Sequence, residues 1–522
     1  MKHRSIILSA VAIGLAGLIA SPASAQEDTL RIRLNADIRS TDPGINRDAN
    51  TDAVVLHMVE GLVAYCEDTS VGPLLAKSVD VSPDGKVYTF NLRDDVKFHN
   101  GAPLTADDVL FSWKRYVDPA NNWRCLPEVD GRGLAKVVNV EAKDAKTVVF
   151  TLEKPSALFL TVLARPDCGE TAIYHRDSLT SDGKWKDPIG TGPFKMGEWK
   201  RGQYIDLLRN DSYAALPGKR DGHTGGKAPL VAKVRFPIIP DSSAAKAALL
   251  SGGLDVIYDV QNSDIPDYKQ RKDVTLREQA TMDINGLLFQ TRDPLLKDVR
   301  IRRALTLALD IPQLVETVTE GASKPSLSII PTPSSYYGKT QAELPKRDIA
   351  AAKKLLAEAG YNGQPIKMLA TKRYPSIFDM AVLAQAMAQE AGVKIDVEVL
   401  DWATLLDRYN KGDYQAMSFS YSSRLDPSLS FEMISGDKDA QPRKVWDNAE
   451  SRKLMTRSME ISDRAQRQAL FDDLEAKFRA DAPMIVLYSA VETSAARANV
   501  QNYSGWALGQ PRAWGVSLKS GS

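Results

Sequence analysis

The side chains best suited to ligand chemistry gather in one stretch of the chain, residues 402–431. This stretch carries two aromatic rings, a hydroxyl, a guanidinium and a carboxylate, at Trp402, Tyr421, Ser423, Arg424 and Asp426. A guanidinium presents a planar fork of N–H donors that fits a carboxylate or a phosphate, and a nearby hydroxyl can add a hydrogen bond. We therefore predict a binding rim for a small, at least partly anionic or polar solute. The alternative is that Arg424 only forms a salt bridge with Asp426 or lies at a helix end.

Local sequence signals predict how this rim is built. Residues 402–409 follow a helical period, and Gly412 ends that run. Residues 414–420 then alternate as in a strand. The proline that follows Asp426 drives that residue out of the helical region. Arg424 is thus expected at the junction between a strand and a loop.

Two other places carry polar groups that fit a ligand site. Arg47 and Asn50 lie at the start of a predicted helix, where polar groups usually cap the helix and where the positive helix end can also face a ligand. Tyr488 ends an apolar strand that begins at Met484. Its hydroxyl is expected either in the core or at the ligand.

Composition places the chain among globular, exported proteins. With 522 residues, 43% of them apolar and 25% charged, the chain suffices for roughly three domain-sized units. Lys2 and Arg4 precede an apolar run and then Ala23-Ser24-Ala25, the pattern of a signal peptide cleaved near Ala25. The run is too short to span a bilayer, and no cysteine follows the cleavage point to carry a lipid. We expect a soluble, periplasmic product.

Charge and motif content argue against several classes of function. Without the signal peptide, 65 basic residues face 66 acidic ones, a net charge of −1. A near-neutral chain without a basic block lacks the electrostatic footprint of a protein that binds nucleic acid. His57, His99, His175 and His223 do not have metal-ligand spacing, and the sequence has no HExxH, GxSxG, CxxC or Walker motif. We expect no catalytic residue, no metal and no cofactor.

The most specific signature lies at residues 75–119, LAKSVDVSPDGKVYTFNLRDDVKFHNGAPLTADDVLFSWKRYVDP. It contains a hairpin signal, Asp84-Gly85, and a capping box, Thr105 with Asp108. This region resembles the signature of the family 5 extracytoplasmic solute-binding proteins, the peptide, dipeptide and nickel receptors of ABC importers. Further matches follow in order and extend the resemblance over essentially the whole mature chain: PIGTGPF (188–194), LLSGGLD (249–255) and DVRIRRAL (298–305).

The resemblance implies an α/β fold of the periplasmic-binding-protein type, with two lobes joined by a two-strand hinge and an extra subdomain in the first lobe. Such a receptor is expected to be a monomer that closes on a small molecule and hands it to the permease of an ABC importer. Helices that alternate with short strands in the second half favour an α/β lobe with largely parallel pairing. The implied division is signal peptide 1–25, lobe I 26–72, extra subdomain 73–189, lobe I again 190–285, lobe II 286–489 and the C-terminal part of lobe I 490–522.

Within the implied subdomain, Trp123 and Arg124 occupy a loop that resembles one reaching the ligand in peptide receptors. Trp123 is expected to stack on the ligand or to pack in the core, and Arg124 to pair with an anion. For the three cysteines of an exported protein, one disulfide and one buried thiol is the simplest arrangement. We expect Cys125 to pair with Cys168 and leave Cys66 free, and three buried thiols remain the alternative.

The resemblance also bears on the ligand. In the peptide receptors of this family, a tryptophan opens the stretch, an aromatic residue ends its strand, and an aspartate soon afterwards binds the α-ammonium of the peptide. Trp402 and Tyr421 match the first two, but the aspartate position falls on Arg424 or on Ser423, according to the anchor used. Because an arginine repels an ammonium, a free-amino peptide fits only if Asp426 takes over that role.

Three functions remain open on the sequence. The first is a receptor for an opine-like conjugate, a sugar acid, a sugar phosphate or a modified peptide. The second is a conventional receptor for di- or oligopeptides. The third is a secreted enzyme on the same scaffold.

Overall fold

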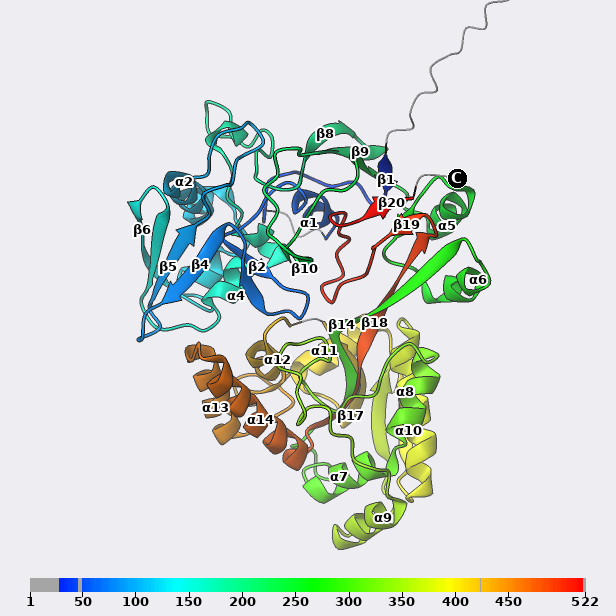
Figure 1. Ribbon diagram of the computed structural model, residues 1–522. Helices are drawn as coiled ribbons and strands as arrows, with labels where there is room; N and C mark the ends of the chain where they lie inside the picture. The colour runs from blue at the N-terminus through cyan, green and yellow to red at the C-terminus, as the bar shows by residue number, and fades with distance from the viewer. Residues whose placement is uncertain (1–27, 46–48, 423, 520–522) are drawn as a thin grey trace, which may run out of the picture.

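The computed structural model describes residues 28–45, 49–422 and 424–519. Two lobes lie one above the other, and two long strands, β14 (Val274–Phe289) and β18 (Met484–Arg497), run from one lobe to the other (Figure 1). This arrangement confirms the bilobal α/β fold with a two-strand hinge. The predicted signal peptide lies outside the described residues.

The two hinge strands pair antiparallel and are irregular in the middle. Regular pairing runs from residue 274 to residue 280 of β14, and the register shifts between residues 280 and 284 and again between residues 285 and 286. Such an irregularity locally increases the bend and twist of a strand. Residues 286 and 490, near which crossings between the lobes are expected, lie within β14 and β18, and all the expected domain boundaries stay predictions.

Lobe I is built on a four-stranded sheet with the order β1-β12-β9-β8, in which only β1 and β12 run parallel. Leu30, Leu207 and Val234 of this sheet are fully buried in the core of the lobe. The strands of this lobe and its nearby hairpins are β1 (Thr29–Arg31), β2 (Val63–Tyr65), β3 (Val71–Pro73), β8 (Phe194–Lys200), β9 (Tyr204–Arg209), β10 (Arg220–Asp221), β11 (Thr224–Gly225), β12 (Lys233–Pro237), β13 (Val256–Ile257), β19 (Val500–Gln501) and β20 (Ser517–Leu518). Its helices are α1 (Ala49–Val55), α5 (Ser242–Ser251) and α6 (Ile265–Lys269).

The extra subdomain of lobe I has its own antiparallel sheet with the order β4-β5-β7-β6. The alternation in the sequence decides its inner face, because Tyr88, Phe90 and Leu92 are buried while their neighbours are half-buried. The capping box also forms, since the Asp108 carboxylate accepts a hydrogen bond from the Thr105 N–H at 2.9 Å. The elements are β4 (Ala76–Val81), β5 (Val87–Leu92), α2 (Ala106–Val117), α3 (Leu126–Val129), β6 (Val137–Asp144), β7 (Thr147–Leu152) and α4 (Phe159–Leu163).

Most of a six-stranded sheet, with the strand order β13-β18-β14-β17-β15-β16, forms the centre of lobe II. Only β15 with β16 and β15 with β17 pair parallel, so the expectation of largely parallel pairing was wrong. The reason is the hinge: the chain enters this lobe along β14 and leaves it along β18, and these two opposed strands fill the centre of the sheet. The other strands are β15 (Ile366–Ala370), β16 (Ile395–Val399) and β17 (Ala416–Tyr421).

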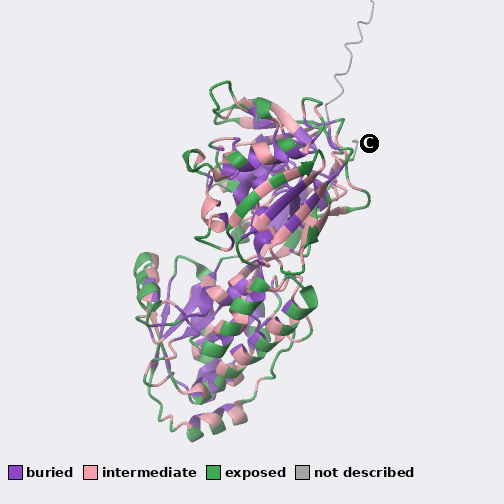
Figure 2. Ribbon diagram, turned by 90° about the vertical axis from the view of Figure 1, so that its left-hand side faces the viewer, coloured by how far each residue is buried: buried purple, intermediate pink, exposed green. Residues whose placement is uncertain are grey.

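The helices of lobe II begin where the sequence signals them. Asp310 and Asp348 cap α8 and α9 by accepting hydrogen bonds from backbone N–H groups at 3.1 and 2.8 Å. Figure 2 shows buried residues inside each lobe and exposed residues on the outer faces of the helices. The helices are α7 (Val299–Ala308), α8 (Ile311–Thr319), α9 (Ile349–Glu358), α10 (Pro375–Glu390), α11 (Trp402–Lys411), α12 (Pro427–Ile434), α13 (Ala449–Glu460) and α14 (Arg464–Asp481). Among the described residues, none of the helices has the length and apolar character needed to cross a membrane.

Candidate functional site

A pocket of about 820 Å³ lies between the two lobes. Residues of α1, the extra subdomain and residues 508–510 line it from lobe I, and the segment from Arg424 to Glu432 lines it from lobe II. We call it the interlobe pocket. Its charged lining residues are Asp52, Arg124, Glu128, Arg165, Asp167, Arg424 and Glu432.

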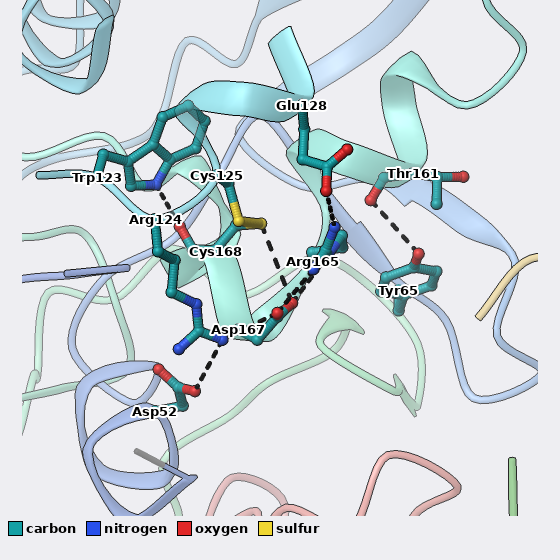
Figure 3. Close-up of a disulfide and its surroundings, with 10 residues drawn as sticks. All are labelled: Asp52, Tyr65, Trp123, Arg124, Cys125, Glu128, Thr161, Arg165, Asp167 and Cys168. Atoms are coloured by element: carbon teal, nitrogen blue, oxygen red, sulfur yellow. Dashed lines mark hydrogen bonds and ion pairs between the residues drawn. A yellow bond between two sulfur atoms is a disulfide. The ribbon is translucent and has the colours of Figure 1, made fainter. Parts of the chain in front are cut away.

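A disulfide organises the lobe I side of the interlobe pocket. The structure joins Cys125 to Cys168, the pairing that the sequence analysis preferred. The chain neighbours of these cysteines, Arg124 and Asp167, face each other as an ion pair with 2.9 Å between Nη2 and Oδ2 (Figure 3). Asp52 of α1 approaches the same Nη2 at 4.0 Å. The covalent link therefore fixes the backbone on both sides of this charged contact.

Arg165 completes the cluster next to the disulfide. Its Nε and Nη2 donate to the two carboxylate oxygens of Asp167 at 2.9 and 2.8 Å, and its Nη1 reaches Glu128 at 3.3 Å (Figure 3). Burial alone would raise the pKa of Asp167, but the hydrogen bond and charge of Arg165, with the charge of Arg124, outweigh it and hold this pKa below its usual range. Asp167 is therefore ionised at neutral pH, and it orients two guanidinium groups at once.

The lobe II side of the interlobe pocket contributes one guanidinium and one carboxylate. Arg424 lies between β17 and α12, and its Nη1 donates to the carbonyl and hydroxyl oxygens of Ser422 at 3.3 and 3.2 Å. Glu432 on α12 pairs with the buried ammonium of Lys444 at 2.8 Å. Lys444 thus neutralises a carboxylate that would otherwise repel an anion.

Asp426 serves the structure of lobe II. It caps α12 by accepting from the Ser428 N–H at 3.0 Å, and it forms an ion pair with Arg467 of α14 at 2.7 Å. The two charged side chains are only 7% and 6% exposed. Asp426 is absent from the described lining of the interlobe pocket, so its carboxylate is committed to holding α12 against α14.

The two aromatic residues of the predicted rim lie elsewhere. Tyr421, at the end of β17, is buried in the lobe II core, where its ring packs edge-on against Phe419. Trp402 begins α11 and stacks on the same Phe419 with ring centroids 5.9 Å apart. Trp402 lines a separate hollow of lobe II, together with Lys372 and Arg373. Of the predicted rim, the structure brings Arg424 to the interlobe pocket and leaves both rings outside its lining.

Among the remaining predicted site residues that the structure describes, one lines the interlobe pocket and the others are buried elsewhere. Arg124 lines the interlobe pocket, whereas Trp123 is buried and donates its ring N–H to the Cys168 carbonyl at 3.0 Å. Asn50 is buried in a polar network with Asn35. Tyr488 lies in the lobe II core, where burial raises its pKa to about 12. Arg47 and Ser423 lie outside the described residues.

Sequence reasoning missed several residues of the interlobe pocket. Arg165 and Asp167 directly precede Cys168, and an Arg-x-Asp pair next to a predicted disulfide was the available signal. Asp52 and Glu432 had no local signal, because their place in the pocket follows only from how the lobes meet. The pocket offers hydrogen-bond donors and charges for holding a polar solute. Cys125, Asp167 and Cys168 bring possible metal-ligand atoms within 4.8 Å of one another, but the two sulfurs are bonded to each other and supply no thiolate.

Comparison with known proteins gives a consistent family. The model of the bacterial extracellular solute-binding proteins, family 5, matches residues 70–442. The oligopeptide-binding protein OppA of Bacillus subtilis (strain 168) is 26% identical over 493 residues, which cover 89% of this chain and 88% of that protein.

Solved structures agree over nearly the full length. The structure of HbpA2 from Haemophilus parasuis is 27% identical with a TM-score of 0.80, and the match covers 94% of this chain and 100% of that one. The binding protein AgaA from A. tumefaciens R10, solved in complex with agropinic acid, is 26% identical with a TM-score of 0.64, covering 95% of this chain and 99% of that one. OppA and AgaA are thus described as binding proteins and not as enzymes.

Proposed function

The chain belongs to the family 5 bacterial extracellular solute-binding proteins, and from this premise we propose that it captures a small polar, partly anionic solute between its lobes. The solute is then delivered to the permease of an ABC importer. The proposed address is the periplasm, reached through a signal peptide cleaved near Ala25. Opine-like conjugates, sugar acids, sugar phosphates and modified peptides are the proposed ligand classes.

The observation that carries the anionic preference is the position of Asp426. In the peptide receptors that this chain resembles, an aspartate soon after the strand binds the ammonium, and within residues 422–431 of this chain the one carboxylate is that of Asp426. Because Asp426 caps α12 and pairs with Arg467 while nearly fully buried, it does not provide that group. Arg424 lines the pocket two residues earlier, and its guanidinium suits a carboxylate or a phosphate.

The other charges of the interlobe pocket support the same preference. Asp167 is bound by two arginines and Glu432 by Lys444, so these carboxylates already have cationic partners from the protein. A ligand that replaced such a partner would have to desolvate and displace it. The AgaA structure, described as a complex with agropinic acid, supports an acidic solute as a ligand for this family.

A conventional peptide receptor is the second candidate. The interlobe pocket also carries the carboxylates of Asp52 and Glu128 on the lobe I side, which offer an alternative place for a peptide ammonium. The relative OppA is described as an oligopeptide-binding protein. As a peptide receptor, the protein would bind the peptide with its ammonium toward lobe I and its carboxylate toward Arg424.

A thermal-shift screen separates the two candidates. Agropinic acid, a sugar acid, a sugar phosphate and a set of dipeptides are added to the purified protein, since a ligand that binds only the native state raises the melting temperature. The proposal expects shifts with the acids or phosphates and none with free-amino dipeptides. The opposite pattern supports the peptide receptor. Small-angle scattering of the protein with a hit should show compaction as the lobes close.

Substitution of Arg424 tests its role with any ligand that the screen identifies. Arg424→Ala removes a charge-assisted, two-pronged contact and should weaken binding by about 100-fold in calorimetry. Arg424→Lys keeps the charge without the planar fork, so its affinity should lie between those of the unaltered protein and Arg424→Ala. Arg408→Ala, on the nearby helix α11, is the matched control and should bind as the unaltered protein does. Unchanged affinity in Arg424→Ala would remove Arg424 from the site.

A further inference from the structure

A second large cavity lies in lobe II and shares no lining residue with the interlobe pocket. It has a volume of about 810 Å³, which is in the range of sites for small molecules. Residues of α7, α9, α14, the start of β18 and the segment 343–345 line it. Figure 1 places α7 and α9 at the end of lobe II farthest from lobe I. We call it the distal cavity.

The inner wall of the distal cavity is apolar. Phe478, Ile485 and Val486 line it, and each is at most 2% exposed. Leu307 and Leu355 continue this wall from α7 and α9. A cavity with such walls favours a hydrocarbon group over water, because apolar surface gains free energy when it leaves water.

The outer wall of the distal cavity is positioned by hydrogen bonds of Arg479. Arg479 donates to the backbone carbonyls of Gln341 and Glu343, each at 3.1 Å, and to the buried carboxylate of Glu475 at 2.8 Å. These bonds fix the segment that carries Leu344 across the cavity, and Leu344 remains 39% exposed. The cavity is therefore preformed and does not depend on a ligand to shape it.

Arg303 supplies a cation at the same cavity. Its Nε donates to the Ala480 carbonyl at 2.9 Å, and its two terminal nitrogens make no hydrogen bond or ion pair with any residue in the described part of the chain. The charged lining consists of Arg303, Arg479 and Glu343, a net charge of +1. Glu343 faces Arg479 at 3.9 Å. An apolar interior beside an available guanidinium is complementary to an anion that carries a hydrocarbon chain.

We propose that the distal cavity binds a single-chain carboxylate amphiphile, with the chain against the apolar wall and the carboxylate at Arg303. This ligand differs from the polar solute of the interlobe pocket, and the proposal does not depend on which solute that pocket takes.

Calorimetric titration with sodium octanoate, decanoate and dodecanoate tests the binding. Each added methylene should raise the affinity about fourfold, so each two-carbon step should raise it about 15-fold. Arg303→Gln should weaken dodecanoate binding about tenfold and leave binding of the neutral dodecanol unchanged. Arg300→Gln, one helical turn earlier on α7, is the control and should change neither. No binding of dodecanoate, or an equal loss of acid and alcohol in Arg303→Gln, overturns the proposal.

Filling the cavity locates the binding. Thr306 lies on α7 and lines the distal cavity, so Thr306→Trp should abolish dodecanoate binding while the melting temperature shows that the variant is folded. Leu355→Phe, on α9, is a second filling variant in case the first does not fold. Thr317→Trp on α8, outside the lining, is the matched control. Dodecanoate binding that survives both filling variants places the ligand elsewhere and contradicts the proposal.

Discussion

Replacing Asp426 by asparagine tests whether this residue holds α12 or binds the ligand. The side chains of Asp426 and Arg467 are 7% and 6% exposed and lie 2.7 Å apart. Removing one partner of a buried ion pair costs about 3–5 kcal/mol, because the other charge stays buried. Asparagine keeps an acceptor for the Ser428 N–H and for Arg467, and Arg467 retains the Ser458 carbonyl at 2.9 Å. We therefore expect a smaller loss in the free energy of unfolding, about 2–3 kcal/mol.

Urea unfolding measures this loss against a surface pair. Asp407 and Lys411 form an ion pair on α11 with side chains 57% and 67% exposed, so Asp407→Asn should cost less than about 1 kcal/mol. The folded Asp426→Asn protein should still bind its ligand with nearly unchanged affinity. A stability equal to that of Asp407→Asn together with lost binding would show that Asp426 is a ligand residue.

Two further predictions concern lobe I. The disulfide between Cys125 and Cys168 closes a loop with a sequence separation of 43. Replacing both cysteines by serine should therefore lower the free energy of unfolding by about 4 kcal/mol, whereas Cys66→Ser, at the free cysteine, should change it little. Equal stability of all variants in urea unfolding would contradict this. Burial raises the pKa of Glu170 to about 8, above the 4.5 of the unfolded chain, so the folded state binds the extra proton and stability should fall as the pH rises from about 4.5 to 8. The slope of the free energy of unfolding against pH that Glu170 contributes is at most about 1.4 kcal/mol per pH unit, and Glu170→Gln should remove it. An unchanged slope in Glu170→Gln would show that Glu170 does not titrate in this pH range.

Much of the fold was predictable because local signals fix it. Gly412 takes the left-handed conformation with a φ of 67° and ends α11, and β17 follows where the alternation predicts a strand. The family resemblance supplied what local signals could not, namely that β14 and β18 link two lobes. The direction of strand pairing in lobe II was mispredicted, because it depends on how the chain crosses the hinge and not on the period of any segment.

The candidate site was predictable only in part. Arg424 and Arg124 carry chemistry that the sequence reveals, and both line the interlobe pocket. Trp402 and Tyr421 have equally suitable chemistry, yet their rings pack on Phe419 within lobe II. Residue type does not distinguish an aromatic ring in the core from one at a ligand, because both contexts reward burial of the same apolar surface.

Mass spectrometry of the solute released from freshly purified protein identifies the ligand that the interlobe pocket holds. A solute held between the lobes of a binding protein can persist through purification and is freed by denaturation. We predict a small molecule with a carboxylate or phosphate group, such as an opine-like conjugate or a sugar acid, whose release is lost in Arg424→Ala. A free-amino peptide that is released equally from both proteins would contradict it.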